Sequence, residues 1–310
     1  MTTNTAPEGA LPLVELGVIR AHGADAASFL HGQLTNDIAH LGAAEARLAG
    51  YCSAKGRLLA SFLVWRCGDD LLLACSADLL AATLKRLRMF VLRAKCTLSD
   101  ASAEVPLHGL AGRAATAWLG DSTPAIGRST VREGATVIRL PDGAGSPRFL
   151  VAGAIADLPL PSLDARAWRW LEVQSGVARI ERATVEHFVP QMLNYELVGG
   201  VDFGKGCYPG QEVVARSQYR GTIKRRSLLF QIAAAAAAGA TEVFHSEDPS
   251  QPAGQVVMAA PSAAGGSLAL VEVKLGALAS GSLHLAAPDG ALLERLPMPY
   301  DVPLEAVAAA

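Results

Sequence analysis

The sequence predicts an α+β fold with antiparallel sheets, followed by a small β-barrel at the C-terminal end. Residues 57–98 run strand, turn, strand, helix, strand, an order typical of an antiparallel sheet with a helix on one face. Residues 111–160 repeat a similar alternation more weakly, which indicates a second α+β unit. After Arg226 short strand patterns follow one another without helices. We therefore expect an α+β region over residues 1–226 and a β-barrel over residues 227–310.

The elements of the first unit follow from hydrophobic periodicity. Residues 13–21 alternate apolar and polar side chains, the pattern of a half-buried strand. Apolar residues between positions 27 and 41 recur at spacings of three and four, which predicts helix, and the capping side chains of residues 35–37 divide it into two short pieces. The next expected elements are strands at 57–65 and 71–75 joined by a turn at 68–70, a helix that buries Leu80, Leu84, Leu87 and Val91, and a strand at 93–98.

The second unit and the barrel are predicted in the same way. A helix is expected at 109–119, strands at 136–140 and 148–151 around a Pro-Asp-Gly turn, and a helix at 163–176 that ends at a glycine. The barrel strands are expected at 228–232, 254–258, 268–273 and 281–285. The alanine tract at 233–238 favours helix by propensity but lies between strand patterns, so helix and linker both stay open.

Composition and charge narrow the possible functions. Hydrophobic residues make up 51% of the chain and charged residues 18%, which is typical of a globular protein and not of a disordered one. The formal net charge of −2 excludes a global basic field for nucleic acid, so any charged partner must meet a local patch. The start of the chain has no targeting pattern, and no stretch reaches the ~20 apolar residues of a membrane helix. We expect a cytoplasmic protein with no nucleic-acid or membrane partner.

The cysteines divide into two kinds. Cys52, Cys67, Cys75 and Cys96 have apolar or strand-like neighbours, so we expect buried, reduced thiols. None of the cysteines has CxxC spacing, and the histidines show no HExxH pattern, so no metal site is expected. The fifth cysteine, Cys207, lies instead in a glycine-rich segment.

That segment is a candidate for chemistry. Residues 199–206 nearly match the P-loop pattern, but Gly206 stands where a hydroxyl must bind Mg²⁺, so nucleotide hydrolysis is not expected. Cys207 lies two residues from Lys205 and just before Pro209, which is suited to open a helix, and both features favour a reactive thiolate. Spacing alone slightly favours the alternative, in which Cys207 is a small residue packed in a glycine turn.

Two further patterns leave alternatives open. A basic run follows the glycine segment and indicates either a solvated face or a site for an anionic ligand tail. Its members are Arg216, Arg220, Lys224, Arg225 and Arg226. Trp168 and Trp170 are two positions apart on the expected helix and so face different sides. One is expected in the core, and the other is available to stack on a planar ring.

The octapeptide Lys-Gly-Cys-Tyr-Pro-Gly-Gln-Glu at 205–212 resembles the signature of the YgfZ family, tetrahydrofolate-binding proteins that act in iron–sulfur cluster assembly and repair. Residues 23–38, 54–57, 188–191 and 197–200 also resemble the family, so the similarity covers most of residues 13–226. The resemblance implies an aminomethyltransferase-like fold, in which α+β subdomains surround a central folate pocket and a β-barrel follows. One pocket tryptophan of the family corresponds to Trp168; the other falls near Leu16, where this chain has no aromatic residue.

The resemblance implies a tetrahydrofolate-binding protein that assists the maturation or repair of iron–sulfur enzymes. Tetrahydrofolate is then the cofactor, and iron–sulfur client or assembly proteins are the partners. On this hypothesis Cys207 acts as a thiolate that Lys205 stabilises, and the basic run attracts the carboxylates of the folate tail. The expected folate-contacting residues are Trp168, Tyr208, Gln211, Glu212, Arg216 and Arg220. A resident cluster is not expected, since clusters need several thiolates.

Three other functions stay open. A folate-dependent aminomethyl- or methyltransferase is disfavoured because residues 56–64 contain no Asp or Glu, where such enzymes place a carboxylate for proton transfer. A thiol hydrolase or transferase acting through Cys207 lacks an identifiable histidine partner in the sequence. A purely structural interaction module needs no reactive thiol at all. We expect an auxiliary assembly factor, and folate-dependent one-carbon transfer if the protein is enzymatic.

Overall fold

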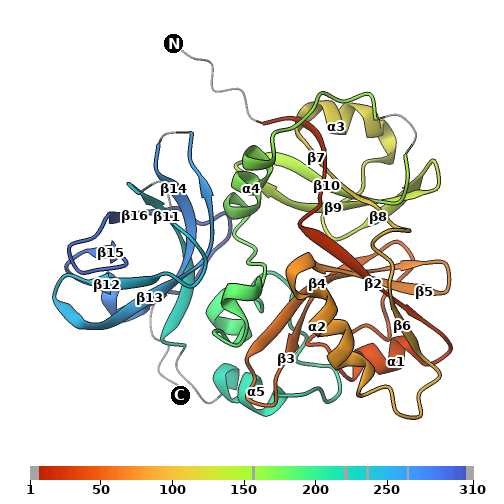
Figure 1. The fold of residues 1–310 in the computed structure, drawn as a ribbon, viewed down its shortest axis with the longest axis horizontal. Coiled ribbons are helices and arrows are strands. Elements are labelled where there is room, and N and C mark those ends of the chain that lie inside the picture. The colour runs from red at the N-terminus through yellow and green to blue at the C-terminus, as the bar shows by residue number, and fades with distance from the viewer. Residues whose placement is uncertain (1–6, 156–157, 220–222, 235–236, 264, 305–310) are drawn as a thin grey trace.

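The computed structural model describes residues 7–155, 158–219, 223–234, 237–263 and 265–304. Two α+β units lie on one side of the molecule and a β-barrel lies on the other (Figure 1). Both five-stranded sheets are antiparallel, and the barrel is closed. The α+β class with a C-terminal barrel is thus confirmed. Among the described residues no helix has the length and apolar character needed to cross a bilayer.

The first unit is a sheet in the order β3-β4-β5-β2-β6 with two helices. Its strands are β2 (Leu16–His22), β3 (Ala46–Cys52), β4 (Leu58–Cys67), β5 (Asp70–Ser76) and β6 (Thr97–Asp100). Its helices are α1 (Ala26–His31) and α2 (Ala77–Arg88). The predicted β4–β5 hairpin is confirmed, and α2 buries the leucines that its spacing singled out.

The second unit is a sheet in the order β1-β7-β10-β9-β8. Its elements are β1 (Gly9–Pro12), β7 (Leu107–Ala111), α3 (Gly112–Leu119), β8 (Ser129–Arg132), β9 (Ala135–Gly143) and β10 (Ser146–Ala152). Helix α4 (Ala165–Gln174) follows, with the Asp164 side chain accepting hydrogen bonds from the first turn. It lies between this unit and the barrel (Figure 1), and its Trp168 and Leu171 pack into a core shared with both sheets.

The barrel follows a long irregular segment that contains two 3₁₀ turns (Arg182–Thr184 and Pro190–Leu193) and helix α5 (Gln211–Tyr219). Its strands are β11 (Arg225–Ile232), β12 (Glu242–His245), β13 (Asp248–Pro261), β14 (Ser267–Lys274), β15 (Leu283–Leu285) and β16 (Leu292–Leu296). The four expected strands are present, whereas β12 and β16 were not predicted. Within the alanine tract, residues 235–236 lie outside the described part of the chain.

The expected second helical piece at 38–41 is wrong, because the polar residues before it have other partners. The Thr35 hydroxyl donates to the carbonyl of Gly200 at 2.6 Å and accepts from the N–H of Gly50 at 2.7 Å. The Asn36 amide donates to the carbonyls of Leu48 and Gly199, each at 2.7 Å. These side chains join distant segments instead of capping a helix, so the chain after α1 runs as irregular structure.

Three other boundaries differ from prediction. Gly109 lies in strand β7, where its missing side chain admits the indole of Trp168, and the helix begins only at Gly112, whose φ is +85°. The Pro-Asp-Gly stretch at 141–143 belongs to β9, and the hairpin turns instead at Ala144 and Gly145, both with positive φ. The strand expected at 93–98 starts at residue 97, because residues 89–94 form consecutive turns with their own backbone hydrogen bonds.

Replacing Thr35 with Val tests whether its hydroxyl ties the first unit to residues 199–200. The substitution keeps the shape but leaves a buried N–H and a buried carbonyl without their partner, so the free energy of unfolding should fall by about 2 kcal/mol. Urea denaturation measures the change. Ser28→Ala, which removes an exposed hydroxyl from α1, should cost less than about 0.5 kcal/mol; equal losses for the two variants would contradict the assignment.

Candidate functional site

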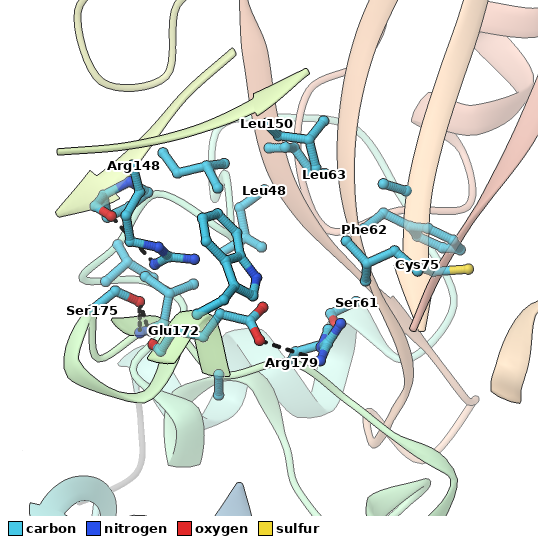
Figure 2. A pocket seen from close by; sticks show the side chains of 18 residues that line it. Leu48, Ser61, Phe62, Leu63, Cys75, Arg148, Leu150, Glu172, Ser175 and Arg179 are labelled. Carbon is cyan, nitrogen blue, oxygen red and sulfur yellow. Dashed lines mark hydrogen bonds and ion pairs between the residues drawn. The ribbon is translucent and has the colours of Figure 1, made fainter. Parts of the chain in front are cut away.

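A cavity of about 150 Å³ lies between the two sheets and is closed on one side by α4 and the segment after it (Figure 2). Its wall is mostly apolar. The apolar and small side chains that line it include Leu16, Leu48, Ser61, Phe62, Leu63, Cys75, Leu140, Leu150 and Val198. Leu16 is the position where the family resemblance leads one to look for an aromatic ring, and it does face the cavity. The central pocket implied by the resemblance is therefore present in the fold.

Three charged residues also line this cavity: Arg148, which is buried, and Glu172 and Arg179, which are partly buried. Glu172 Oε2 lies 3.4 Å from Arg179 Nη2 and 3.5 Å from Arg169 Nη1. Burial alone raises the pKa of the Glu172 carboxyl, but the surrounding guanidinium groups outweigh burial and hold that pKa below its usual value. Burial lowers the pKa of Arg148 to about 10. At neutral pH the wall thus carries an ionised carboxylate between ionised arginines.

Several donors in this wall have no hydrogen-bond partner among the described residues. They are Trp168 Nε1, Arg148 Nε, and Nε and Nη1 of Arg179. Buried donors of this kind are rare in folded proteins, because each costs about 1–3 kcal/mol when it loses water without gaining a partner. A cavity with unpartnered donors and one ionised carboxylate is suited to a flat polar molecule. Such a molecule offers acceptors to the unpartnered donors and donors to the carboxylate.

Trp168 is largely enclosed by the protein. The indole is 2% exposed, and the guanidinium carbon of Arg148 lies 4.6 Å from its ring centroid. A Cβ added at Gly109 would stand 3.0 Å from the same ring, so the backbone of β7 packs against it. Trp168 therefore lines the cavity, but much of its surface already has protein contacts.

The thiol loop, residues 205–212, lies at the surface and contributes no residue to the cavity wall. Cys207 is exposed, while Lys205 and Tyr208 are buried beside it. Lys205 Nζ donates to the carbonyls of His31 at 2.5 Å and Leu34 at 2.9 Å, and it lies 4.7 Å from the Tyr208 ring centroid. Burial lowers the pKa of Lys205 to about 8. The lysine thus anchors the loop to the end of α1, and its effect on the thiol stays a prediction.

Two facing glycines fix the other end of the thiol loop. Gly210 and Gly56 both have positive φ, +78° and +69°. A Cβ added at Gly210 would stand 2.6 Å from the Gly56 Cα, so the two turns pack backbone against backbone. Pro209 and Gly210 lead directly into α5, as expected. The structure therefore brings together three stretches that resemble the family: residues 23–38, 54–57 and 205–212.

The remaining predicted site residues that the structure describes lie away from the cavity. Gln211 and Glu212 open α5, and Glu212 forms an exposed ion pair with Arg216 at 3.1 Å. Arg225 pairs with Glu272, and buried Arg226 pairs with Glu196. Arg220 lies outside the described residues. Val198 lines the cavity, and the chain that follows it leads to Cys207. One continuous segment therefore connects the cavity with the thiol loop.

Sequence reasoning missed the charged part of the cavity. Glu172 lies four residues after Trp168 on α4, and this spacing places both on one face of the helix. That signal was available, but a Glu on an amphipathic helix usually faces solvent. Arg148 and Arg179 belong to a strand and a loop that give no such hint. The expectation of four buried thiols was also wrong at Cys67, which is exposed beside the turn of the β4–β5 hairpin.

Acid titration tests the polar cluster beside the thiol loop. His31 Nδ1 lies 2.9 Å and His40 Nδ1 lies 2.8 Å from the Asp37 carboxylate. Burial alone raises the Asp37 pKa, but these hydrogen bonds lower it from 3.8 to about 2. The carboxylate therefore stabilises the fold above its unfolded pKa, and this contribution is lost as the pH falls toward 2. Between pH 5 and pH 3, the free energy of unfolding measured in urea should fall by about 1 kcal/mol less in Asp37→Asn than in the wild type. An equal fall in the two proteins would exclude this role for Asp37.

No protein-family model matches the chain. Among curated proteins, the "tRNA-modifying protein YgfZ" of Sodalis glossinidius (strain morsitans) is 31% identical over 318 residues, which cover 96% of this chain and 95% of the relative. Proteins with the same description from Serratia proteamaculans (strain 568) and Colwellia psychrerythraea (strain 34H / ATCC BAA-681) are 31% and 33% identical. These two alignments cover 69% of this chain each, and 68% and 69% of the relatives.

Among solved structures, the glycine cleavage system aminomethyltransferase T from Bartonella henselae superposes with a TM-score of 0.70. The match covers 97% of this chain and 87% of that protein at 16% sequence identity, a likeness that shows the fold and nothing further. The identity and the near-complete coverage of the Sodalis protein, together with this fold, decide the classification. The chain belongs to the YgfZ family and has the fold of the glycine-cleavage aminomethyltransferase.

Proposed function

We propose that this protein binds tetrahydrofolate in the cavity between the two sheets and assists the maturation or repair of iron–sulfur enzymes. The observation that carries the folate part is the pairing of an ionised, partly buried carboxylate with unpartnered donors in an apolar wall. The pterin ring of a reduced folate presents adjacent N–H donors, which a carboxylate accepts as a pair, and a carbonyl oxygen and ring nitrogens that accept from donors. Glu172 is suited to the first task, and Arg148, Trp168 and Arg179 are suited to the second.

The size of the cavity supports the same assignment. Pockets that enclose a whole drug-sized ligand usually measure roughly 300–1,000 Å³. The cavity of about 150 Å³ therefore suits a ring system, with the rest of the folate outside. Trp168 would contribute its Nε1–H and its ring edge, because Gly109 and Arg148 already occupy much of its surface. Arg225 and Arg226 are paired with Glu272 and Glu196, so neither offers a free guanidinium to the tail carboxylates.

The iron–sulfur part of the proposal rests on Cys207 and the family resemblance. Cys207 is exposed on a loop that Lys205 and Gly210 hold in place, so a partner protein can reach its sulfur. Among the described residues no three His, Cys, Asp or Glu side chains gather as ligands of a metal ion. We propose that the thiol meets sulfur, a cluster or a redox group carried by a partner. The relatives are named for tRNA modification, and iron–sulfur enzymes that modify tRNA are therefore the clients to test first.

A folate-dependent transferase remains the alternative, because the fold is that of an aminomethyltransferase. The cavity argues against it. Strand β4 contributes Ser61, Phe62 and Leu63 to the wall, and Glu172 is the one carboxylate among the described lining residues. Arginines on several sides keep Glu172 ionised, so it is poorly suited to shuttle protons. Turnover of methylene-tetrahydrofolate with an amine donor by the purified protein would favour the transferase.

Glu172→Gln tests the folate site. The neutral amide lacks the charge-assisted pair of acceptors, so the affinity for tetrahydrofolate, measured by calorimetric titration, should fall about 10- to 100-fold. Glu181→Gln is the matched control, because Glu181 pairs with the same Arg169 and Arg179 but does not line the cavity. Absence of binding by the wild-type protein, or equal losses in the two variants, would exclude Glu172 as the pterin partner.

Cys207→Ser tests the thiol. Cells that carry this variant in place of the wild type should lose activity of an iron–sulfur tRNA-modifying enzyme, measured as the level of the modified nucleoside. Cys67→Ser removes the other exposed cysteine and should leave that level unchanged. Tetrahydrofolate affinity should be the same in both variants, because neither cysteine lines the cavity. Normal modification in the Cys207→Ser cells would remove the thiol from the mechanism.

A further inference from the structure

The C-terminal end of α2 carries a surface that neither the cavity nor the thiol loop uses. Three apolar side chains are exposed in succession around it: Met89 is 59%, Phe90 is 43% and Leu92 is 89% exposed. Five exposed cations lie beside them in the chain. They are Lys85, Arg86, Arg88, Arg93 and Lys95. We call these eight residues the basic–apolar tip.

The charges of the tip are not neutralised by the protein itself. Among the described residues no carboxylate forms an ion pair with any of the five cations, and Arg88 donates instead to the carbonyl of Leu98. The basic run that the sequence singled out is different. There Arg216, Arg225 and Arg226 each pair with a Glu of the same chain. The tip is therefore a cluster of five cations without a carboxylate partner among the described residues.

The tip is also held in shape. The N–H groups of Met89, Phe90 and Val91 donate to carbonyls of the last turn of α2, and Ala94 donates to Val91 at 3.0 Å. Val91 and Ala94 pack against the core, which fixes the base of the tip while the outer side chains face solvent. A preformed surface of this kind loses little conformational entropy when a partner binds.

We propose that the basic–apolar tip is the docking surface for a partner protein that presents an acidic segment with interspersed apolar side chains. The five unpaired cations complement acidic residues, and the exposed Met89 and Leu92 bury apolar side chains of the same segment. This inference does not depend on folate binding. Because the net charge is −2, an acidic partner must bind to a local positive patch, and the tip is such a patch.

A protein explains the tip better than RNA or a membrane does. Proteins read single-stranded RNA by stacking bases on aromatic rings. The tip offers one such ring, Phe90, and the guanidinium carbon of Arg86 lies 6.0 Å from its centroid. Membrane-surface helices insert a long apolar face, but the apolar face of α2 is buried in its own domain, as Leu84 and Leu87 show. Three protruding apolar side chains suit a short protein segment.

The tip and the thiol loop are attached to the same strand of the first unit. Burial raises the pKa of the Tyr51 hydroxyl in β3, and the nearby charge of Arg86 partly opposes that rise. Tyr51 pairs through its backbone with Leu34, whose carbonyl accepts from Lys205. A partner bound at the tip therefore lies on the same α+β unit to which the loop of Cys207 is anchored.

Fluorescence anisotropy with a short labelled peptide of alternating Glu and Leu tests the proposal on the full chain. We expect saturable binding that weakens with salt. Met89→Ser combined with Leu92→Ser should reduce the affinity about tenfold, as should Lys85→Gln combined with Arg93→Gln and Lys95→Gln, and the latter should also flatten the salt dependence. Val131→Ser, which changes an apolar residue that is 71% exposed on β8, should have an effect below about twofold.

Four comparison probes separate the possible partners. Peptides of alternating Glu and Ser, or of Lys and Leu, should bind at least about tenfold more weakly than the Glu–Leu peptide. Single-stranded polyuridine and vesicles of phosphatidylglycerol with phosphatidylcholine should bind without sensitivity to Met89→Ser and Leu92→Ser. No saturable binding of the Glu–Leu peptide, equal binding by all protein variants, or tip-dependent binding of the RNA or the vesicles in place of the peptide would overturn the proposal. Circular dichroism confirms that each variant is folded.

Discussion

The partly buried carboxylate of Glu172 is the constraint around which the centre of this molecule is organised. A carboxylate without partners in such a place costs several kcal/mol, so the fold must bring cations to it. Arg169 and Arg179 do so from α4 and from the segment that follows it. Arg169 also donates to the carbonyl of Ala259 in β13, which connects the barrel to the same ion cluster. The ion cluster therefore fixes how α4 lies against the barrel and which side chains face the cavity.

The structure separates two features that the family resemblance joins. The cavity lies between the sheets, whereas Cys207 lies at the surface on a loop anchored by Lys205 and by the contact between Gly56 and Gly210. The chain from residue 198 to residue 207 connects them, and the side chains of Thr35 and Asn36 hold its start. A ligand in the cavity and a partner at the thiol can thus be present together, each contacting its own part of the protein.

How far the sequence determined these features depends on how local their causes are. The β4–β5 hairpin, α2 and four barrel strands follow from short-range periodicity, and all were predicted. The irregular stretch after α1 was not, because Thr35 and Asn36 bond to residues more than 160 positions away. The sequence around Gly109 does not indicate a role for this glycine. In the structure the Trp168 ring packs against its backbone, in the space that a side chain would need. Arg216 and Arg225 suggested an anion site, but their partners Glu212 and Glu272 show how a basic run can be neutralised within the chain.

The unpaired cations at the end of α2 have a consequence for how the molecule moves. Because the whole chain carries a formal charge of −2, the remainder must be more acidic than that total. Residues 85–95, which contain no Asp or Glu, therefore form a positive segment on a chain whose other residues carry a net negative charge. The electric field of an acidic partner orients such a molecule before contact. This orientation raises the fraction of collisions that lead to binding. A nearly neutral protein can in this way approach a negatively charged one with a preferred face.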